Sequence, residues 1–364
     1  MRMKLYLNLI LGLCFVMALG FLYYSSWRIS LRFWVHKSVY DEQGFLLSLD
    51  STLSLELTYK YGNLSEGACK PGFAAAKMTV IYPKFTKLAP VFLDPNYKRF
   101  SRIGNFPPPF GVKSQETIID HLLSLTKNYG LGEDLDSLNC KKCIIIGNGG
   151  ILVNKSLGQK IDEYDVVVRL NGAPVKCFEK DVGSKTTLRI TYPEGAIQKT
   201  EHYEDQSLFV LSAFKAQDFK WLRHMVYKQN LVRLTDGFWK SVARRVPREA
   251  SDMRILNPYF IQEASFKLIG LPHNNGQMGR GNIPTLGTVA ITMALHNCDE
   301  VAVAGFGYNM STPDAPLHYY EKVKMLAIKE SWTHNIPKEK EFLQKLVKAG
   351  VIQDLTNGIC GAKC

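Results

Sequence analysis

Short apolar runs alternate with amphipathic stretches along most of the chain. Runs rich in β-branched residues predict buried strands at 143–147, 165–170, 186–191, 207–212 and 300–305. Helices are expected from about residue 114, where Ile118, Ile119, Leu122, Leu123 and Leu125 are the apolar residues, and at 155–162 and 286–296. Strands that alternate with helices predict one α/β domain with a mostly parallel sheet and helices on both faces.

The first apolar run is of another kind. Residues 5–24 are almost entirely apolar and follow Arg2 and Lys4, and about 20 such residues can cross a bilayer as a helix. A cleaved secretory signal ending at Ala18-Leu19-Gly20 is the alternative. We favour an uncleaved signal anchor, because the run is longer than a typical signal core. Residues 1–4 are then a cytoplasmic tail and 25–65 a stem, and either interpretation places the remaining chain in the secretory lumen.

Charge and sequons refine this placement. The net charge of +12 is spread along the chain without a basic run, which argues against a nucleic-acid partner and favours a basic catalytic domain that handles an anionic donor. Asn63, Asn154 and Asn309 each begin an Asn-X-Ser sequon, as expected for glycosylation of a lumenal protein.

The cysteines have more than one interpretation. Cys140 and Cys143 form a CxxC pair, a spacing found in zinc and redox sites, but an oxidising lumen favours disulfides. Cys14 lies in the anchor, and seven others remain. Because seven is odd, at least one is unpaired or bridges two chains, so a homodimer stays open.

Glycine-containing loops, whose backbone is not covered by side chains, follow two of the predicted strands. Gly147-Asn148-Gly149-Gly150 follows the first, and Asn171 ends the second. In open α/β sheets ligands bind beyond the carboxyl ends of the strands, so two asparagines there could bind a sugar or base. The loop does not match the GxGxxG dinucleotide fingerprint, and both asparagines could equally cap turns.

Thr285 is placed as the N-cap of the helix at 286–296, whose N-terminus is a natural phosphate site. The strand after that helix ends in Gly305-Phe306-Gly307, a third such loop.

His318 and His334 are candidates for proton transfer or phosphate stabilisation, because histidine titrates near neutrality. They lie too far apart in sequence for a local zinc pair, and HExxH is absent. Asp134-Leu135-Asp136 has the DxD form of a metal-binding pair, but it precedes the first core strand in a polar linker, and we interpret it as solvated charge.

Together these residues resemble the animal-type sialyltransferases. The large motif of that family is similar to residues 143–187 and its small motif to 284–307. The third motif resembles His318-Tyr319-Tyr320-Glu321, and the very small motif matches His334 with Glu339. The resemblance runs from the anchor through the stem segment 65–72 to about Ile359, which implies a lumenal catalytic domain at 66–359 and a tail at 360–364.

The resemblance implies a single-domain, Rossmann-like variant of the GT-A glycosyltransferase fold in a type II Golgi membrane protein. It implies metal-independent transfer, with inversion, of sialic acid from CMP-sialic acid to the 3-hydroxyl of terminal galactose in Galβ1-3/4GlcNAc chains of glycoproteins and glycolipids. His334 would be the general base, His318 would stabilise the leaving phosphate, and the CMP site would be lined by Asn148, Asn171, Thr285, Gly287 and Gly307. Disulfides would join Cys143 to Cys298 and Cys69 to Cys140.

Departures and alternatives remain. Cys177 stands where relatives are expected to carry a small residue, which suggests a buried free thiol, and Cys360 and Cys364 extend past the usual end of the family.

The alternative functions are a lactosylceramide-type glycolipid α-2,3-sialyltransferase, an inactive glycan-binding relative and a nicotinamide-dependent enzyme. The last lacks the fingerprint.

Overall fold

The computed structural model describes residues 12, 14–21, 61, 64, 67–87, 89–96, 102–229, 236–307, 309, 311–330 and 332–361. Most of the predicted anchor and stem, with the sequon asparagine Asn63, lies outside these residues. Residues 12 and 14–21 are helical and exposed. Within the described ranges, no helix combines the length and the apolar character needed to span a bilayer.

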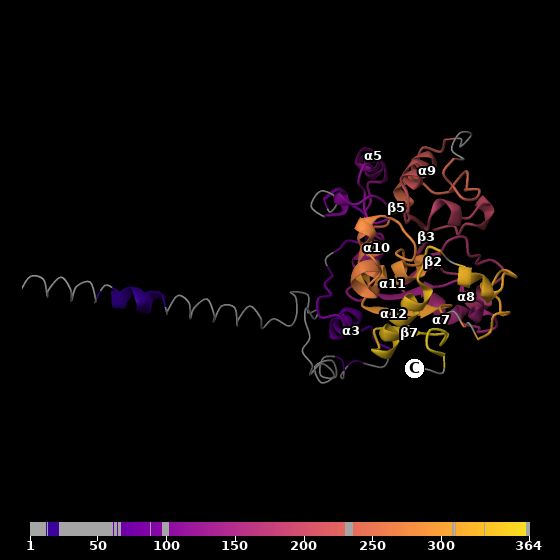
Figure 1. Ribbon diagram of the computed structural model, residues 1–364. Helices are drawn as coiled ribbons and strands as arrows, with labels where there is room; N and C mark the ends of the chain where they lie inside the picture. Colours follow the sequence, from indigo (N-terminus) through magenta and orange to yellow (C-terminus); the bar gives the residue numbers. More distant parts are fainter. Residues whose placement is uncertain are drawn as a thin grey trace, which may run out of the picture.

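Seven strands form one sheet in the order β5-β4-β3-β2-β1-β6-β7, and every neighbouring pair is parallel (Figure 1). The strands are β1 (Lys142–Ile146), β2 (Val166–Leu170), β3 (Leu188–Thr191), β4 (Leu208–Leu211), β5 (Met253–Ile255), β6 (Glu300–Ala304) and β7 (Ile352–Asp354). The five strands predicted from sequence are confirmed to within two residues. β5 and β7 were missed because a strand of three residues leaves too short an apolar run to recognise.

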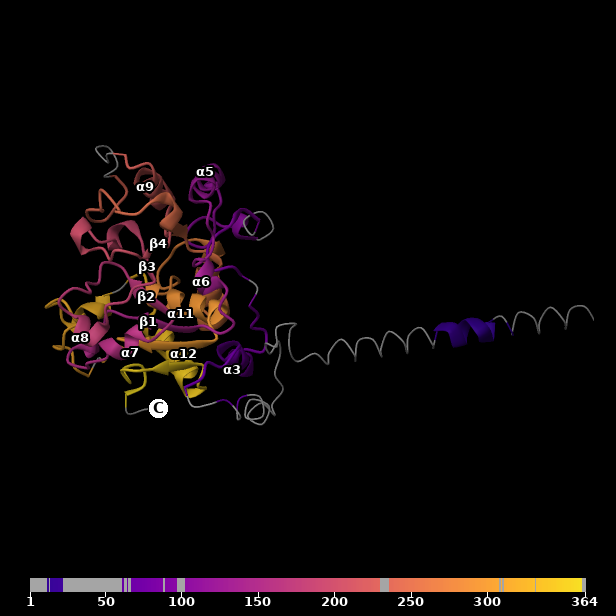
Figure 2. The same ribbon diagram turned by 180° about the vertical axis from the view of Figure 1, so that it is seen from behind.

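Helices cover both faces of the sheet, as predicted (Figures 1 and 2). They are α3 (Phe73–Ile81), α5 (Glu116–Thr126), α6 (Glu133–Asp136), α7 (Gly158–Asp162), α8 (Glu179–Val182), α9 (Ala216–Val226), α10 (Tyr259–Gln262), α11 (Leu286–Asn297) and α12 (Ile336–Lys348). Cys143 and Ile145 of β1 pack with α11, while Ile144 and Ile146 pack with residues of α7 and α8. This alternation follows from the two-residue period of a strand.

The helix predicted at 155–162 is wrong at its start, since α7 begins at Gly158. Asn154 and Ser156 both have positive φ, of 61° and 51°, so the chain turns there before the helix can begin. The expected helices near 114–125 and at 286–296 are confirmed as α5 and α11.

Two disulfides join distant segments, with the partners that the family resemblance implied. Cys143 pairs with Cys298 and Cys69 with Cys140, each with Cα atoms 6.0 Å apart. The zinc and redox interpretations of the CxxC pair are therefore wrong. Buried Asp299 reinforces the second crosslink by accepting hydrogen bonds from the amides of Gly72 (2.8 Å) and Lys141 (2.7 Å).

The remaining cysteines differ from one another. Cys177 is a free thiol, but it is exposed rather than buried. The prediction was wrong because Cys177 has a φ of 74° in the turn between β2 and α8, which faces solvent. Cys360 is disulfide-bonded.

The strand order reverses at β1. The chain moves outward from β1 through β2, β3, β4 and β5, and then returns to place β6 on the other side of β1. Such a reversal opens a crevice at the carboxyl ends of the two strands, which is where open parallel sheets bind ligands. The loops after β1 and β6 are the glycine-rich segments 147–150 and 305–307.

Candidate active site

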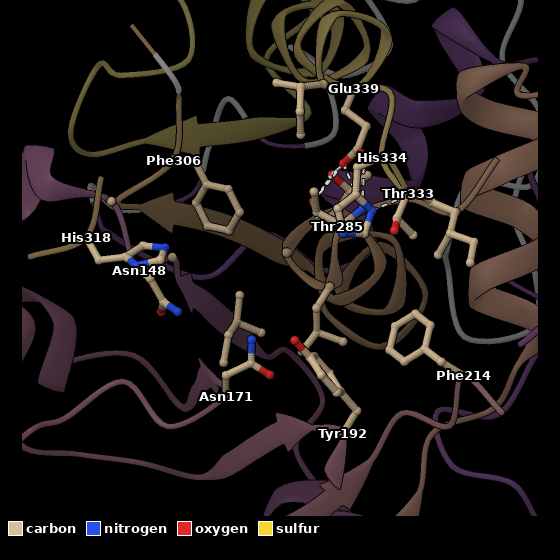
Figure 3. A pocket seen from close by; sticks show the side chains of 18 of the residues that line it. Asn148, Asn171, Tyr192, Phe214, Thr285, Phe306, His318, Thr333, His334 and Glu339 are labelled. Carbon is tan, nitrogen blue, oxygen red and sulfur yellow. Dashed lines mark hydrogen bonds between the residues drawn. The ribbon is translucent and has the colours of Figure 1, made fainter. Parts of the chain in front are cut away.

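A cavity of about 540 Å³ lies at this switch point (Figure 3). It is lined by every donor-site and catalytic residue proposed from the sequence: Asn148, Asn171, Thr285, Gly287, Gly307, His318 and His334. These residues come from segments up to 186 positions apart (334 − 148). The fold therefore brings the four sequence motifs to one place, while the individual roles remain predictions.

Glycine in the two loops allows them to pack against each other. A Cβ on Gly147 would lie 2.5 Å from the carbonyl oxygen of Gly305, and a Cβ on Gly149 would lie 2.6 Å from the same atom. Gly307 has a φ of 99°, and its Cβ would approach the carbonyl oxygen of Gly358 to 1.9 Å. The absent side chains at these positions thus make room for neighbouring backbone, whereas the sequence suggested only that a ligand needed the space.

The two asparagines have different surroundings. The buried side-chain oxygen of Asn148, Oδ1, has no hydrogen-bond partner among the described residues. Asn171 occupies a left-handed turn, with φ at 52°, and its carbonyl oxygen accepts a hydrogen bond of 2.7 Å from Arg189. Asn171 therefore fits the turn interpretation as well as a ligand role. The unsatisfied Asn148 oxygen favours a ligand that donates a hydrogen bond.

Thr285 is the N-cap of α11, as predicted, with its hydroxyl accepting from the amide of Thr288 at 3.4 Å. The structure also places Glu339 of α12 at the N-terminus of α11. Its carboxylate accepts from the Thr285 amide at 3.0 Å, the Thr285 hydroxyl at 2.7 Å and the Thr288 hydroxyl at 2.6 Å. The Thr285 amide is already bonded, so a phosphate at this helix would meet the next amides, those of Leu286 and Gly287.

Burial raises the pKa of the Glu339 carboxyl above its ordinary value. The protonated form of the His334 ring and the hydrogen bonds from Thr285 and Thr288 oppose that effect without cancelling it. In Figure 3 the side chains of Glu339, His334 and Thr285 gather at one end of the cavity.

His334 is oriented by the main chain. Its Nδ1 lies 2.9 Å from the carbonyl oxygen of Ile283. A carbonyl can only accept, so Nδ1 carries the hydrogen, and the neutral ring then has its lone pair on Nε2. This tautomer is the one in which Nε2 can accept a proton.

His318 is held against the first glycine loop. It forms an isolated antiparallel bridge with Gly149, and the next amide, that of Tyr319, donates to the Asn148 carbonyl at 3.0 Å. The His318 ring stacks on Tyr320, with centroids 5.4 Å apart, and its Nδ1 pairs with the Glu321 carboxylate. The carboxylate complements a positively charged ring, so His318 and His334 are set up for different chemistry.

Several lining residues were not predicted from the sequence. Tyr192 and Phe214 follow β3 and β4 and lie at the end of the cavity away from His318 (Figure 3). The rule that drew attention to Asn148 and Asn171, position just beyond a strand, would also have identified them. Glu194 and Lys215 form an ion pair of 2.7 Å in the same wall, and nothing local in the sequence indicates that contact.

The other sequence candidates lie outside the cavity lining. Asp136 accepts hydrogen bonds of 3.2 Å from the amides of Leu131 and Gly132, so it caps a turn. In the part of the chain that the structure describes, no group of three or more His, Cys, Asp or Glu residues is placed to hold a metal. Asn154 and Asn309 are exposed, as glycosylation would require.

Comparisons with known proteins agree with this geometry. The sequence profile of glycosyltransferase family 29 (sialyltransferase) matches residues 93–351. The CMP-N-acetylneuraminate-beta-1,4-galactoside alpha-2,3-sialyltransferase of Homo sapiens is 65% identical over 368 residues, covering 97% of this chain and 98% of the relative. The lactosylceramide alpha-2,3-sialyltransferase of the same organism is 40% identical over 297 residues, covering 80% of this chain and 71% of the relative.

A crystal structure of a mammalian sialyltransferase shares the fold. It superposes with a TM-score of 0.60 at 23% sequence identity, covering 80% of this chain and 98% of that one. The profile match spans well over half of the chain, and the closely similar relatives cover nearly all of it. The chain belongs to glycosyltransferase family 29, the sialyltransferases.

Proposed function

We propose that this protein transfers sialic acid from CMP-N-acetylneuraminate to the 3-hydroxyl of a terminal galactose in β-galactoside glycans. The observation that carries the proposal is that His318, His334 and all five donor-site candidates line one cavity at the switch point of the sheet. The 65% identical relative is named for this reaction on β-1,4-galactosides. The parallel sheet and its cavity are consistent with a variant GT-A fold.

In this mechanism the galactose O3 attacks C2 of the sialic acid from the side opposite CMP. The new C2–O3 bond forms as the bond from C2 to the phosphate oxygen breaks, which inverts the configuration at C2. His334 Nε2 takes the hydroxyl proton, and CMP leaves with the electron pair of the broken bond. His318, paired with Glu321, offers positive charge to the leaving phosphate.

The donor needs groups that bind it without reacting. Asn148 Oδ1 can accept a hydrogen bond from the nucleotide or sugar, and the loops at 147–150 and 305–307 bound the same end of the cavity. Tyr192 and Phe214 at the other end offer apolar faces to an acceptor sugar. Closing both ends around the substrates excludes the water that would otherwise hydrolyse the donor.

A transfer assay tests the proposal. The full-length protein in detergent is incubated with CMP-sialic acid and Galβ1-3GlcNAc, Galβ1-4GlcNAc or lactosylceramide, with and without a metal chelator. We expect transfer to the disaccharides in both conditions. Transfer to lactosylceramide alone would favour the glycolipid alternative suggested by the 40% identical relative, and binding without transfer would favour an inactive glycan-binding protein. Loss of activity with the chelator would overturn the metal-independent mechanism.

We also propose a Golgi membrane protein of type II topology, with residues 1–4 in the cytoplasm and the catalytic domain in the lumen. The apolar run at 5–24 and the sequons at Asn63, Asn154 and Asn309 support this location. Digestion of sealed Golgi vesicles with protease and peptide N-glycosidase tests the topology and the sequons. Nonreducing electrophoresis tests for a disulfide-linked homodimer.

A further inference from the structure

A second, basic groove lies beside the active-site cavity. Its volume is about 490 Å³, and it is lined by segments at 198–201 and 241–245. Three exposed cations, Lys199, Arg244 and Arg245, face a single acid, Glu201. Within the described ranges, no hydrogen bond or ion pair occupies the side chains of these three cations, so the groove carries uncompensated positive charge.

The walls of the groove are fixed to the body of the protein. The Gln198 side-chain amide donates to the Ser241 carbonyl at 3.4 Å and so connects the two segments. The carbonyl of Ala243 accepts a 2.9 Å hydrogen bond from the indole of Trp221 in α9, and both residues are fully buried. The cations at 244 and 245 therefore follow a backbone that is anchored in the core.

The groove adjoins the cavity through two short stretches of chain. Trp239 lines the cavity and Ser241 lines the groove, and two residues span at most about 7 Å. On the other wall, Glu194 lines the cavity and Gln198, four positions later, lines the groove. Trp239 is 69% exposed, and the Lys240 ammonium lies 4.9 Å from its ring centroid. A glycan that leaves the cavity past Trp239 reaches the groove next.

We propose that the groove binds an anionic substituent, a sulfate ester or a carboxylate, on an inner sugar of the acceptor glycan. The inference rests on the proposed function, because it requires an acceptor whose terminal galactose occupies the cavity. Guanidinium groups suit such anions, since their N–H donors match the oxygens in pairs. The net charge of +12 has the sign required to attract an anionic acceptor.

An anionic membrane surface would satisfy the same cations, but the position of the groove argues against it. The helix that follows the predicted stem, α3, packs against α11 and β6. The groove segments precede β4 and β5, at the opposite edge of the sheet. Figures 1 and 2 show α3 and α9 at opposite ends of the domain.

The test compares two acceptors, Galβ1-4GlcNAc and the same disaccharide carrying a 6-O-sulfate on its GlcNAc. We expect the wild-type protein at low salt to have the higher kcat/KM with the sulfated acceptor, and the advantage to shrink as salt rises. In Arg244→Gln/Arg245→Gln the ratio of the two kcat/KM values should fall about fivefold, as expected for the loss of two exposed charge contacts. Arg244→Lys/Arg245→Lys should retain most of the advantage.

Lys176→Gln/Lys180→Gln is the matched control, since it removes two exposed charges that line neither the groove nor the cavity, and it should leave the ratio unchanged. An equal fall of the ratio in Arg244→Gln/Arg245→Gln and in Lys176→Gln/Lys180→Gln, or no wild-type preference for the sulfated acceptor, overturns the proposal. Loss of binding to phosphatidylserine vesicles with an unchanged ratio would assign the groove to lipid instead and also overturn it. If Arg244→Gln/Arg245→Gln does not fold, Lys199→Gln tests the same ratio of the two kcat/KM values.

Failure of the proposed function is distinguishable from failure of this inference. The neutral disaccharide reports the transfer reaction itself, and the ratio of the two acceptors reports the groove.

Discussion

At the scale of single residues, the two histidines that line the cavity are suited to different roles because the partners of their Nδ1 atoms differ. The Nδ1 of His334 donates to a neutral carbonyl, that of Ile283, whereas the Nδ1 of His318 pairs with the Glu321 carboxylate. In the first arrangement the lone pair of the neutral ring lies on Nε2, and in the second a carboxylate lies against the ring. The sequence identified both histidines, but it could not show the Ile283 carbonyl, which lies 51 positions away.

Replacing the proposed base separates binding from chemistry. We expect His334→Ala to lower kcat by about 10²- to 10⁴-fold, the usual contribution of a general base, while the Kd for CMP, measured by calorimetry, stays near the wild-type value. His202→Ala is the control, because His202 is exposed and outside the cavity lining. Parallel loss of CMP binding and activity would contradict a role limited to proton transfer.

Gly307 offers a second test at this scale. Gly307→Ala must accept both a φ of 99° and a Cβ placed 1.9 Å from the Gly358 carbonyl oxygen. Gly270→Ala faces a similar φ of 74° with no atom within 4 Å of its Cβ. We expect Gly270→Ala to cost about 1 kcal/mol from the backbone alone, and Gly307→Ala about 3 kcal/mol more from the clash. Urea unfolding measures both, and equal losses would show that the clash relaxes at no cost.

At the scale of elements, α12 and α11 are joined by one buried carboxylate. Glu339 in the first turn of α12 receives three donors from the N-terminus of α11. His334 stands just before α12, so the same contact locates the proposed base relative to α11. Either helix alone would lack a partner for these polar groups.

This contact predicts a pH dependence of stability. Burial raises the pKa of Glu339 above 4.5, so the folded state binds this proton more tightly than the unfolded state. The contribution of Glu339 to the free energy of unfolding is therefore greatest at low pH and falls as pH rises from about 4.5 through the raised folded-state pKa. In Glu339→Gln that fall should be absent.

The measurement is urea unfolding of both proteins between pH 4.5 and pH 8. The stability of the wild type relative to Glu339→Gln should decline with rising pH. A constant difference would show that Glu339 titrates normally in the folded protein.

At the scale of the whole molecule, the Cys143–Cys298 disulfide closes a chain segment that contains most of the sheet. It connects β1 to the end of α11 across 155 positions. Its loss in Cys143→Ser/Cys298→Ser should lower the free energy of unfolding by about 5 kcal/mol in the chain-entropy account. The loops after β1 and β6 should also bind CMP more weakly.

Cys177→Ser is the control for that experiment, because Cys177 is an exposed free thiol and its replacement should leave unfolding unchanged. Denaturant unfolding under nonreducing conditions compares the two proteins. A double variant as stable as the wild type would show that packing of α11 against the sheet suffices without the crosslink.

The sequence by itself determined the fold class, five of the seven strands, the α5 and α11 helices and the loops that end in the cavity. Strand periodicity, glycine after a strand and N-capping are local properties, so they can be read from neighbouring residues. The family motifs also determined which histidines and cysteines to examine.

Only the tertiary structure decided where these parts meet. It placed the Glu339 carboxylate at the N-terminus of α11 and the carbonyl oxygen of Gly305 against the loop at 147–150. It also placed the basic groove beside Trp239. It also showed Cys177 to be exposed. Each of these facts depends on the distance between residues far apart in the chain, or on exposure, and those are set by packing of the whole sheet and its helices.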